Sequence, residues 1–203
     1  DSAYFDTATD FFTAKSSEGR IILPNYPTYQ QTTEFTCGPA AALTVMYYYG
    51  VKDYDEASLA RGMKTQPYPI GTNPKDMLAF FEGLKWKTES NITHSRFEEY
   101  DDFMNFVKKN LAENTPIMVE NVEWGGHWRV IIGYDSMNTD SDLDDVLIFA
   151  DSYDTSDHKQ DGYAVGNGRR FYAMWFAHSN TPEDQRNQPY VVEIGRASCR
   201  ERV

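Results

Sequence analysis

The chain has 203 residues, of which 40% are hydrophobic and 15% aromatic, and this composition predicts one globular domain rather than a disordered chain. A formal net charge of −12 disfavours nucleic acids and anionic membranes as partners. No apolar run approaches the roughly 18 residues that a membrane span needs, and the sequence has neither a Gly-rich phosphate loop nor a paired-cysteine metal motif.

The two ends of the chain are set apart from a predicted main domain over residues 20–192. Residues 1–19 are interpreted as an N-terminal arm. Because the first residue is not Met, we expect either a removed signal peptide or a fragment that starts within a gene. Residues 193–203 resemble the translation of a common sequencing adapter and are interpreted as an artefact, Cys199 included. Cys37 is then the one remaining cysteine, and no disulfide is expected.

The first half of the domain has helical signals. Pro39 suits a first helical turn, and the apolar run that follows predicts a buried helix ending at Gly50. Cys37 should therefore lie at or just before a helix N-terminus. Asp55 is expected to cap a second helix, and Ser95 to cap a longer amphipathic one. Further helices are thus predicted over residues 56–63, from residue 74, and over residues 95–110.

The second half is rich in β-type segments. Strands are predicted over residues 116–122, 127–134, 146–151 and 188–192, while 170–177 fits either a helix or a strand. Helices followed by antiparallel strands indicate an α+β fold.

The start of the first helix is a favourable place for a reactive thiol. Free backbone N–H groups and the helix dipole would lower the pKa of Cys37. A nucleophile also needs an oxyanion donor, and Gln31, six residues earlier, could fold back over the sulfur and act with the Cys37 N–H. Gln30 is the competing residue for this role. For an isolated cysteine, simple core packing is the alternative interpretation.

A base and an orienting acid follow in chain order. Of the four histidines, only His127 has a suitable setting, because it follows a Gly-Gly turn and opens a predicted strand. Asp151 ends the next strand and could orient the imidazole, with Asp154 and Asp135 as alternatives. The order Cys, His, Asp fits a catalytic triad. A hydrogen bond at the strand start is the alternative role for His127.

Other candidates lie around the same turn. Trp124, Gly126 and Trp128 are expected to wall a substrate groove, although both tryptophans could equally be core residues. Arg129 should face the opposite side of its strand from Trp128. The acidic stretches 135–145 and 151–161 lack the ligand spacing of an EF-hand loop, so we interpret them as solvated loops and expect no metal site.

Together these motifs resemble a papain-like cysteine peptidase, most similar to the bacteriocin-leader-processing peptidases and their stand-alone relatives, over residues 20–192. The elements that carry the resemblance are Gln31, Cys37-Gly38-Pro39-Ala40, Gly126-His127-Trp128 and Ala150-Asp151. The resemblance implies a papain-like fold with Cys37 as nucleophile, His127 as base, Asp151 as orienting acid and Gln31 as oxyanion donor. Leader-processing members are fused to membrane transporters, and this chain has no such part, so their Gly-Gly leader substrate is not carried over.

The expected activity is hydrolysis of peptide bonds by a cysteine-type peptidase without a cofactor. The expected partner is a peptide or protein substrate, with no nucleic acid and no membrane, and the protein is expected to be a bacterial monomer that is secreted or at the cell surface. Two alternatives remain open at this point. One is an acyltransferase of the transglutaminase or transpeptidase type, and the other is a catalytically silent peptide-binding module.

Overall fold

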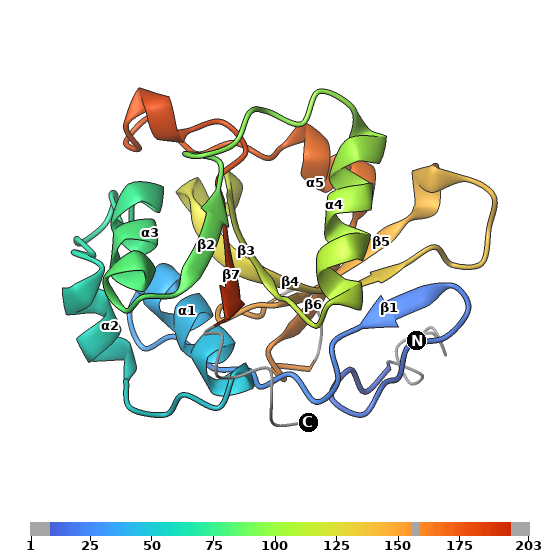
Figure 1. Cartoon of the computed structure of the whole chain (residues 1–203), viewed down its shortest axis with the longest axis horizontal. Helices are drawn as coiled ribbons and strands as arrows, with labels where there is room; N and C mark the ends of the chain where they lie inside the picture. The colour runs from blue at the N-terminus through green and yellow to red at the C-terminus, as the bar shows by residue number, and fades with distance from the viewer. Residues whose placement is uncertain (1–8, 156–158, 196–203) are drawn as a thin grey trace.

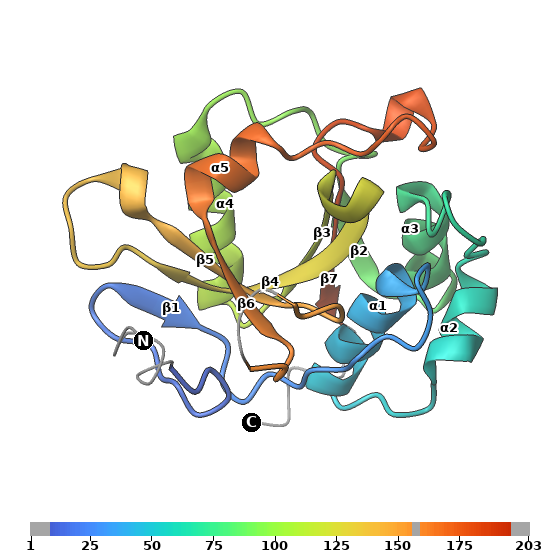
Figure 2. The same cartoon turned by 180° about the vertical axis from the view of Figure 1, so that it is seen from behind.

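An antiparallel sheet with helices on either side makes up the protein (Figure 1), whose computed structural model describes residues 9–155 and 159–195. Helices α1 (Cys37–Tyr48), α2 (Glu56–Gly62) and α3 (Pro74–Gly83) gather on one side of the molecule. Helices α4 (Tyr100–Ala112) and α5 (Gly168–Ala173) lie on the other, as the reverse view in Figure 2 also shows. This arrangement confirms the predicted α+β class.

The sheet places the start of one strand beside the end of the next, although these residues are more than twenty positions apart in the sequence. Its strands run in the order β2-β7-β3-β4-β5-β6, every neighbouring pair is antiparallel, and β1 pairs separately with β4. Because β4 and β5 are antiparallel neighbours, the start of β4 lies beside the end of β5. The strands are β1 (Arg20–Ile22), β2 (Lys87–Ser90), β3 (Ile117–Asn121), β4 (His127–Asp135), β5 (Val146–Ala150), β6 (Tyr163–Asn167) and β7 (Tyr190–Gly195).

Helix α1 is the central core helix that the sequence predicts. Its first ten residues, from Cys37 to Met46, are all buried, and a helix that is apolar on all sides belongs inside a domain. It packs against β4. Pro39 lies in its first turn, where a missing N–H costs nothing, and Gly50 follows its end with a φ of 78°.

Helix α4 begins four residues later than predicted. Its N-cap is Glu99, not Ser95. The segment just before it is held by tertiary hydrogen bonds: Gln188 Oε1 accepts from the Phe97 N–H at 2.8 Å, and the Tyr172 hydroxyl donates to the Phe97 carbonyl at 2.8 Å. These contacts, made by residues far along the chain, override the local capping signal.

Three further segments of the structure were not specified by the sequence analysis. Strand β6 was not predicted; it pairs with β5 along its whole length, and its glycine content obscures the β pattern. Segment 170–177, which fitted either a helix or a strand, comprises residues 170–173 of α5 and the loop that follows them. Strand β7 runs to Gly195, three residues past the predicted domain end at 192.

Residues 1–8 of the predicted arm and residues 196–203, with Cys199, lie outside the described residues. In the described part, none of the helices is long and apolar enough to cross a membrane.

Candidate active site

Cys37 is the first residue of α1, and its side chain is only 7% exposed. Burial on its own raises the pKa of the thiol. A hydrogen bond to the His127 side chain, the charge of that imidazole, and the backbone N–H groups of Trp128 and Gly38 outweigh burial, so the pKa of Cys37 lies below its usual value. The surroundings therefore favour the thiolate.

His127 is the first residue of β4 and is buried. Its Nε2 lies 2.7 Å from Asp151 Oδ1, which leaves Nδ1 as the ring nitrogen that can meet the Cys37 sulfur. Burial lowers the pKa of His127, but the hydrogen bonds to Asp151 and Cys37 and the charges of both partners raise it to about 9. The imidazole thus keeps its proton at neutral pH, beside a thiol whose own pKa is lowered.

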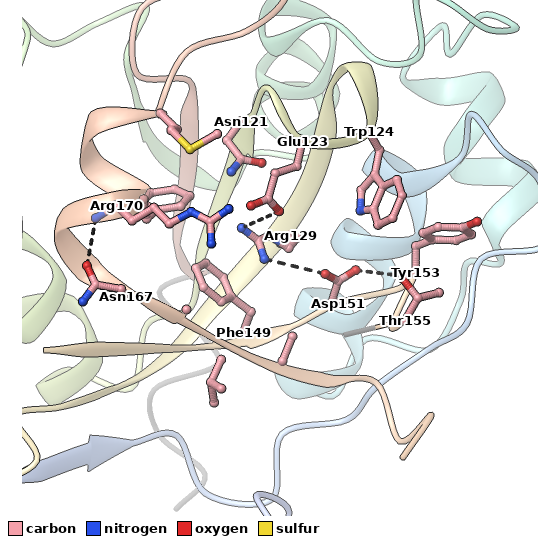
Figure 3. Close-up of a pocket in the computed structure, with 15 residues that line it drawn as sticks. Asn121, Glu123, Trp124, Arg129, Phe149, Asp151, Tyr153, Thr155, Asn167 and Arg170 are labelled. Carbon is pink, nitrogen blue, oxygen red and sulfur yellow. Dashed lines mark hydrogen bonds and ion pairs between the residues drawn. The ribbon is translucent and has the colours of Figure 1, made fainter. Parts of the chain in front are cut away.

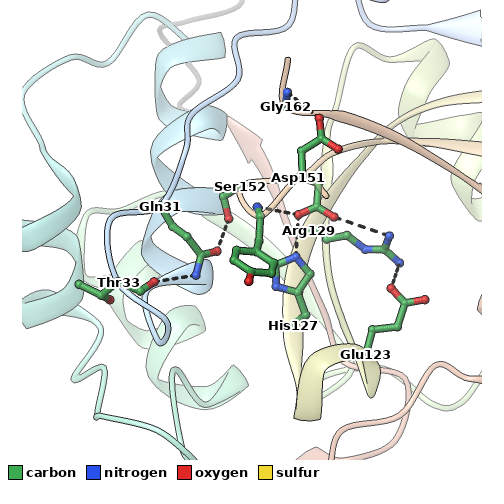
Figure 4. A network of polar contacts seen from close by, with 10 residues as sticks. Gln31, Thr33, Glu123, His127, Arg129, Asp151, Ser152 and Gly162 are labelled. Atoms are coloured by element: carbon green, nitrogen blue, oxygen red, sulfur yellow. Dashed lines mark hydrogen bonds and ion pairs between the residues drawn. The ribbon is translucent and has the colours of Figure 1, made fainter. Parts of the chain in front are cut away.

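Asp151 directly follows β5 and completes the series Cys37, His127, Asp151; Figure 4 shows its contact with His127. Its Oδ1 also accepts from the Tyr153 N–H at 2.9 Å, and its Oδ2 lies 3.8 Å from Arg129 Nη1. Burial raises the pKa of Asp151, yet the hydrogen bond and charge of His127, followed by Arg129, hold it below the usual range. The carboxylate is therefore ionised and fixes the ring of His127.

The two alternative acids lie elsewhere. Asp154 Oδ2 accepts from the Gly162 N–H at 3.2 Å. Asp135 ends β4, at the opposite end of the strand from His127, and accepts from the Met137 N–H at 2.8 Å. Of the three candidates, only Asp151 has a hydrogen bond to the imidazole.

Gln31 lies on the loop before α1, with both ends of its side-chain amide engaged. Its Nε2 donates to the Thr33 carbonyl at 2.7 Å, and its Oε1 accepts from Ser152 Oγ at 2.8 Å (Figure 4). The structure describes no hydrogen bond between Gln31 and Cys37, but one hydrogen of the amide NH2 group remains available. Gln30 is exposed, whereas Gln31 is buried and tied to Ser152, the residue after Asp151.

The three residues expected to wall a groove have different environments. Trp128 is 1% exposed and donates from Nε1 to the Thr72 carbonyl at 3.0 Å, so it is a core residue and the groove-wall prediction is wrong for it. Trp124 is 65% exposed and has a φ of 55°. Gly126 has a φ of 120°, and a Cβ there would lie 2.3 Å from the His178 ring. Trp124 and Gly126 stay predictions as substrate contacts, and Trp124 lines a cavity beside Asp151.

The ion pairs of Arg129 and the buried position of Glu120, both near the triad, were not predicted. Arg129 faces away from the Trp128 side, as expected, but its ion pairs with Glu123 (3.4 Å) and Asp151 were not foreseen. Glu120 is buried on β3. Burial, and then the charge of Cys37, raise its pKa well above the usual value. The sequence did contain a signal: Glu120 and Arg129 each stand inside an otherwise apolar strand. Charged residues are seldom buried unless they are paired, so this pattern indicates a buried partner.

No metal site is found in the described part of the chain, where no three His, Cys, Asp or Glu residues gather as ligands would. In the acidic stretch 135–145, Asp142 instead forms an ion pair with Arg169. His158, in the second acidic stretch, lies outside the described residues.

Comparisons with known proteins identify the family and the fold. The model of the Peptidase_C39 like family matches residues 23–181. The peptidase domain of Streptococcus ComA, a bi-functional ABC transporter involved in quorum sensing, is similar in structure, with a TM-score of 0.55 and 18% identity over 83% of this chain and 98% of that one. A double glycine motif protease from an AMS/PCAT transporter, solved with a leader peptide, gives a TM-score of 0.49 and 14% identity over 87% and 94%.

A search of curated proteins found no match. The family match spans most of the chain, and the ComA domain shares its mixed helical and antiparallel architecture, which confirms the papain-like fold. The chain therefore belongs to the Peptidase_C39 like family, a group with a cysteine peptidase fold.

Proposed function

We propose that this protein is a cysteine peptidase that hydrolyses peptide bonds through Cys37, His127 and Asp151. The observation that carries the proposal is the continuous chain from a buried thiol of lowered pKa, through an imidazolium, to an ionised carboxylate. Membership of the Peptidase_C39 like family supports a peptidase, and the retained triad supports an active one. A silent module would have no need for this set of matched pKa values.

The reaction would begin with attack of the Cys37 thiolate on a peptide carbonyl. The Cys37 N–H and the remaining amide hydrogen of Gln31 would hold the oxyanion. His127 would then give its proton to the leaving amine, and water would release the acyl group from sulfur. Asp151 keeps the imidazole oriented throughout, and Ser152 keeps Gln31 beside the site.

The first test is the rate of Cys37 alkylation by iodoacetamide as a function of pH, in a Cys199→Ser background so that only one thiol reacts. Because the pKa of Cys37 is lowered and that of His127 is raised to about 9, we expect a reactive plateau that extends below pH 7. His127→Ala removes the main stabilising partner of the thiolate, so the plateau should disappear. A wild-type rate that rises only near pH 8.5 or above would overturn the proposal.

Product analysis separates hydrolysis from acyl transfer. A synthetic peptide library is incubated with the enzyme, with and without a primary amine, and the products are identified by mass spectrometry. Free carboxylic acids as the main product with amine present support the peptidase. Amidated products in place of the acids would identify an acyltransferase with the same triad.

A further inference from the structure

A cavity of about 260 Å³ adjoins the triad at Asp151. Its wall is built by four separate parts of the chain: β3 and the turn after it, β4, the β5–β6 region, and α5 (Figure 3). The polar residues that face it are Asn121, Glu123, Arg129, Asp151, Asn167 and Arg170. The mechanism above uses only Asp151 of this set.

Arg129 lies in this cavity with incomplete hydrogen bonding. The side chain is 8% exposed, and its Cζ lies 4.0 Å from the centre of the Phe149 ring. Glu123 and Asp151 engage its two terminal nitrogens, whereas Nε has no partner among the described residues. An unpaired buried donor costs about 1–3 kcal/mol. The Nε donor is buried as well as unpaired, so Arg129 is a cation in the cavity wall rather than an open set of donors.

Arg170 adds a second guanidinium to the same cavity. Figure 3 shows its side chain pointing toward Arg129. In the described chain it has no ion pair, whereas its neighbour Arg169 pairs with Asp142 and lies over the Tyr100 ring at 4.5 Å. Asn121 contributes a buried side-chain amide whose Oδ1 is also unpartnered. Glu123 and Asp151 also line the cavity, but they pair with Arg129 and His127, so the charge of Arg170 has no ionic partner among the described residues and is complementary to a carboxylate.

The order of the triad residues relates the cavity to the direction of a bound substrate. The thiol of Cys37 meets one side of the His127 ring and Asp151 meets another. Since His127 must protonate the leaving amine, the chain that follows the cleaved bond passes the imidazole and continues toward Asp151. At the cavity rim, Trp124 and Tyr153 make an edge contact with ring centres 5.5 Å apart, and both are exposed. They offer an apolar wall to that chain.

We propose that this cavity is a subsite for a carboxylate on the leaving-group side of the substrate, bound by Arg170, with Arg129 as the neighbouring cation in the wall. The inference rests on the proposed peptidase function, because that function defines the leaving-group side. Two sources of the carboxylate share this chemistry: an acidic side chain a few residues after the cleaved bond, or the C-terminal carboxylate of a short substrate.

Binding of product-like peptides tests the subsite without turnover. The probes are short alanine peptides with a free amino terminus, carrying aspartate or asparagine at the first, second or third position and amidated at the C-terminus. A second pair has no acidic side chain and ends in either a carboxylate or an amide. Calorimetry with the Cys37→Ala protein should show about tenfold tighter binding of one carboxylate probe than of its neutral partner. Which pair shows the difference identifies the source.

Arg170→Gln should abolish that preference, while Arg169→Gln, a matched change one residue away, should retain it. In the active enzyme the same preference should appear as a lower KM in peptides that contain the acidic group after the cleaved bond. Equal affinities for both members of every pair, or a preference that survives in Arg170→Gln, would overturn the subsite. A preference that persists when no peptide is cleaved and Cys37 reacts as an ordinary thiol would overturn the peptidase and retain a carboxylate site.

Discussion

At the scale of single residues, Gly126 is required by the way His127 enters its strand. Its φ of 120° is disfavoured by any residue with a Cβ, and the space that a Cβ would take is filled by the His178 ring. Glu120 Oε1 would also lie 3.4 Å from that Cβ. The glycine therefore sets the position of the neighbouring imidazole.

Gly126→Ala should lower kcat/KM by roughly 100-fold, because a displacement of about 1 Å in a catalytic group costs that much. Gly125→Ala is the matched control: it also has a positive φ, of 79°, but a Cβ there meets nothing within 4 Å. Steady-state kinetics of the two variants separates the collision from the backbone strain. Similar losses in both would show that strain alone matters.

Asp151 determines how high in pH the imidazolium survives. The hydrogen bond and charge of this carboxylate raise the pKa of His127 to about 9, against the lowering effect of burial. In Asp151→Asn, burial is opposed only by Cys37, so the pKa of His127 should fall and the alkaline limb of kcat/KM should move to lower pH. Asp135→Asn, at the far end of β4, should leave the profile in place. An alkaline limb unchanged in Asp151→Asn would contradict the assigned role.

The residues around the site differ in how far the sequence predicts them, because only some of them leave a local signal. Cys37, His127 and Asp151 each stand at the boundary of an element, and boundaries leave local signals such as Pro39. The direction in which a tryptophan side chain points leaves no such local signal. Trp124 and Trp128 flank the same turn, yet Trp124 is exposed and Trp128 is buried. The partners of Arg129 depend on the sheet register, which no local pattern specifies.

At the scale of elements, the loop before α1 is held by the first residue of α2. The buried carboxylate of Glu56 accepts from the Thr32 N–H at 3.0 Å, from the Thr32 hydroxyl at 3.0 Å, from the Tyr29 hydroxyl at 2.8 Å and from the Thr36 hydroxyl. Burial raises the pKa of Glu56, but these hydrogen bonds outweigh it and lower the pKa. One side chain thus fixes both the residue next to Gln31 and the N-cap of α1.

Glu56→Gln should loosen this loop, since an amide oxygen is a weaker acceptor than a carboxylate. We expect a loss of about 1.5–3 kcal/mol in the free energy of unfolding, together with a fall in kcat through misplacement of Gln31. The folded-state pKa of Glu56 is lowered, so its contribution is present above the unfolded value and is lost as pH falls through the folded one. Urea unfolding at pH 7 and pH 3 should show the difference between wild type and variant shrinking at low pH. A constant difference would exclude the charge as its cause.

The elements differ in how much of them could be inferred. Helix α1 was predicted within one residue because its apolar run, Pro39 and Gly50 agree. The start of α4 and the whole of β6 were not predicted, because the first is decided by contacts with Gln188 and Tyr172 and the second by pairing with β5. Local patterns identify an element reliably where local and tertiary preferences coincide.

At the scale of the whole molecule, the site exists only when the helical side and the sheet are docked. Cys37 comes from α1, whereas His127 begins β4 and Asp151 directly follows β5. Helix α1 packs directly on β4. The same hydrophobic core therefore stabilises the fold and holds the thiol against the imidazole. Substitutions that loosen this core should therefore also disturb the contact between the thiol and the imidazole.

One core position opposes that stability at neutral pH. Glu193, on β7 at the beginning of the segment interpreted as an artefact, is 0% exposed, and neither carboxyl oxygen has a partner in the described structure. Burial raises its pKa well above the usual value, so the folded protein keeps the carboxyl protonated. In the unfolded chain the same group ionises near pH 4.3.

Glu193→Gln should therefore stabilise the protein in a pH-dependent way. A raised folded-state pKa means that the stability linked to this group is fully present below the unfolded value and is lost as pH rises toward the folded one. Wild type and variant should unfold alike at pH 4, and the variant should gain about 1.4 kcal/mol for each further pH unit while the folded carboxyl stays protonated. Urea titrations at pH 4, 5, 6 and 7 measure this slope, with Glu82→Gln on the exposed end of α3 as the control. A difference of the same size at every pH would mean that Glu193 is ionised in the folded protein, and its neighbours in β2 and β7 would have to supply a compensating charge or water.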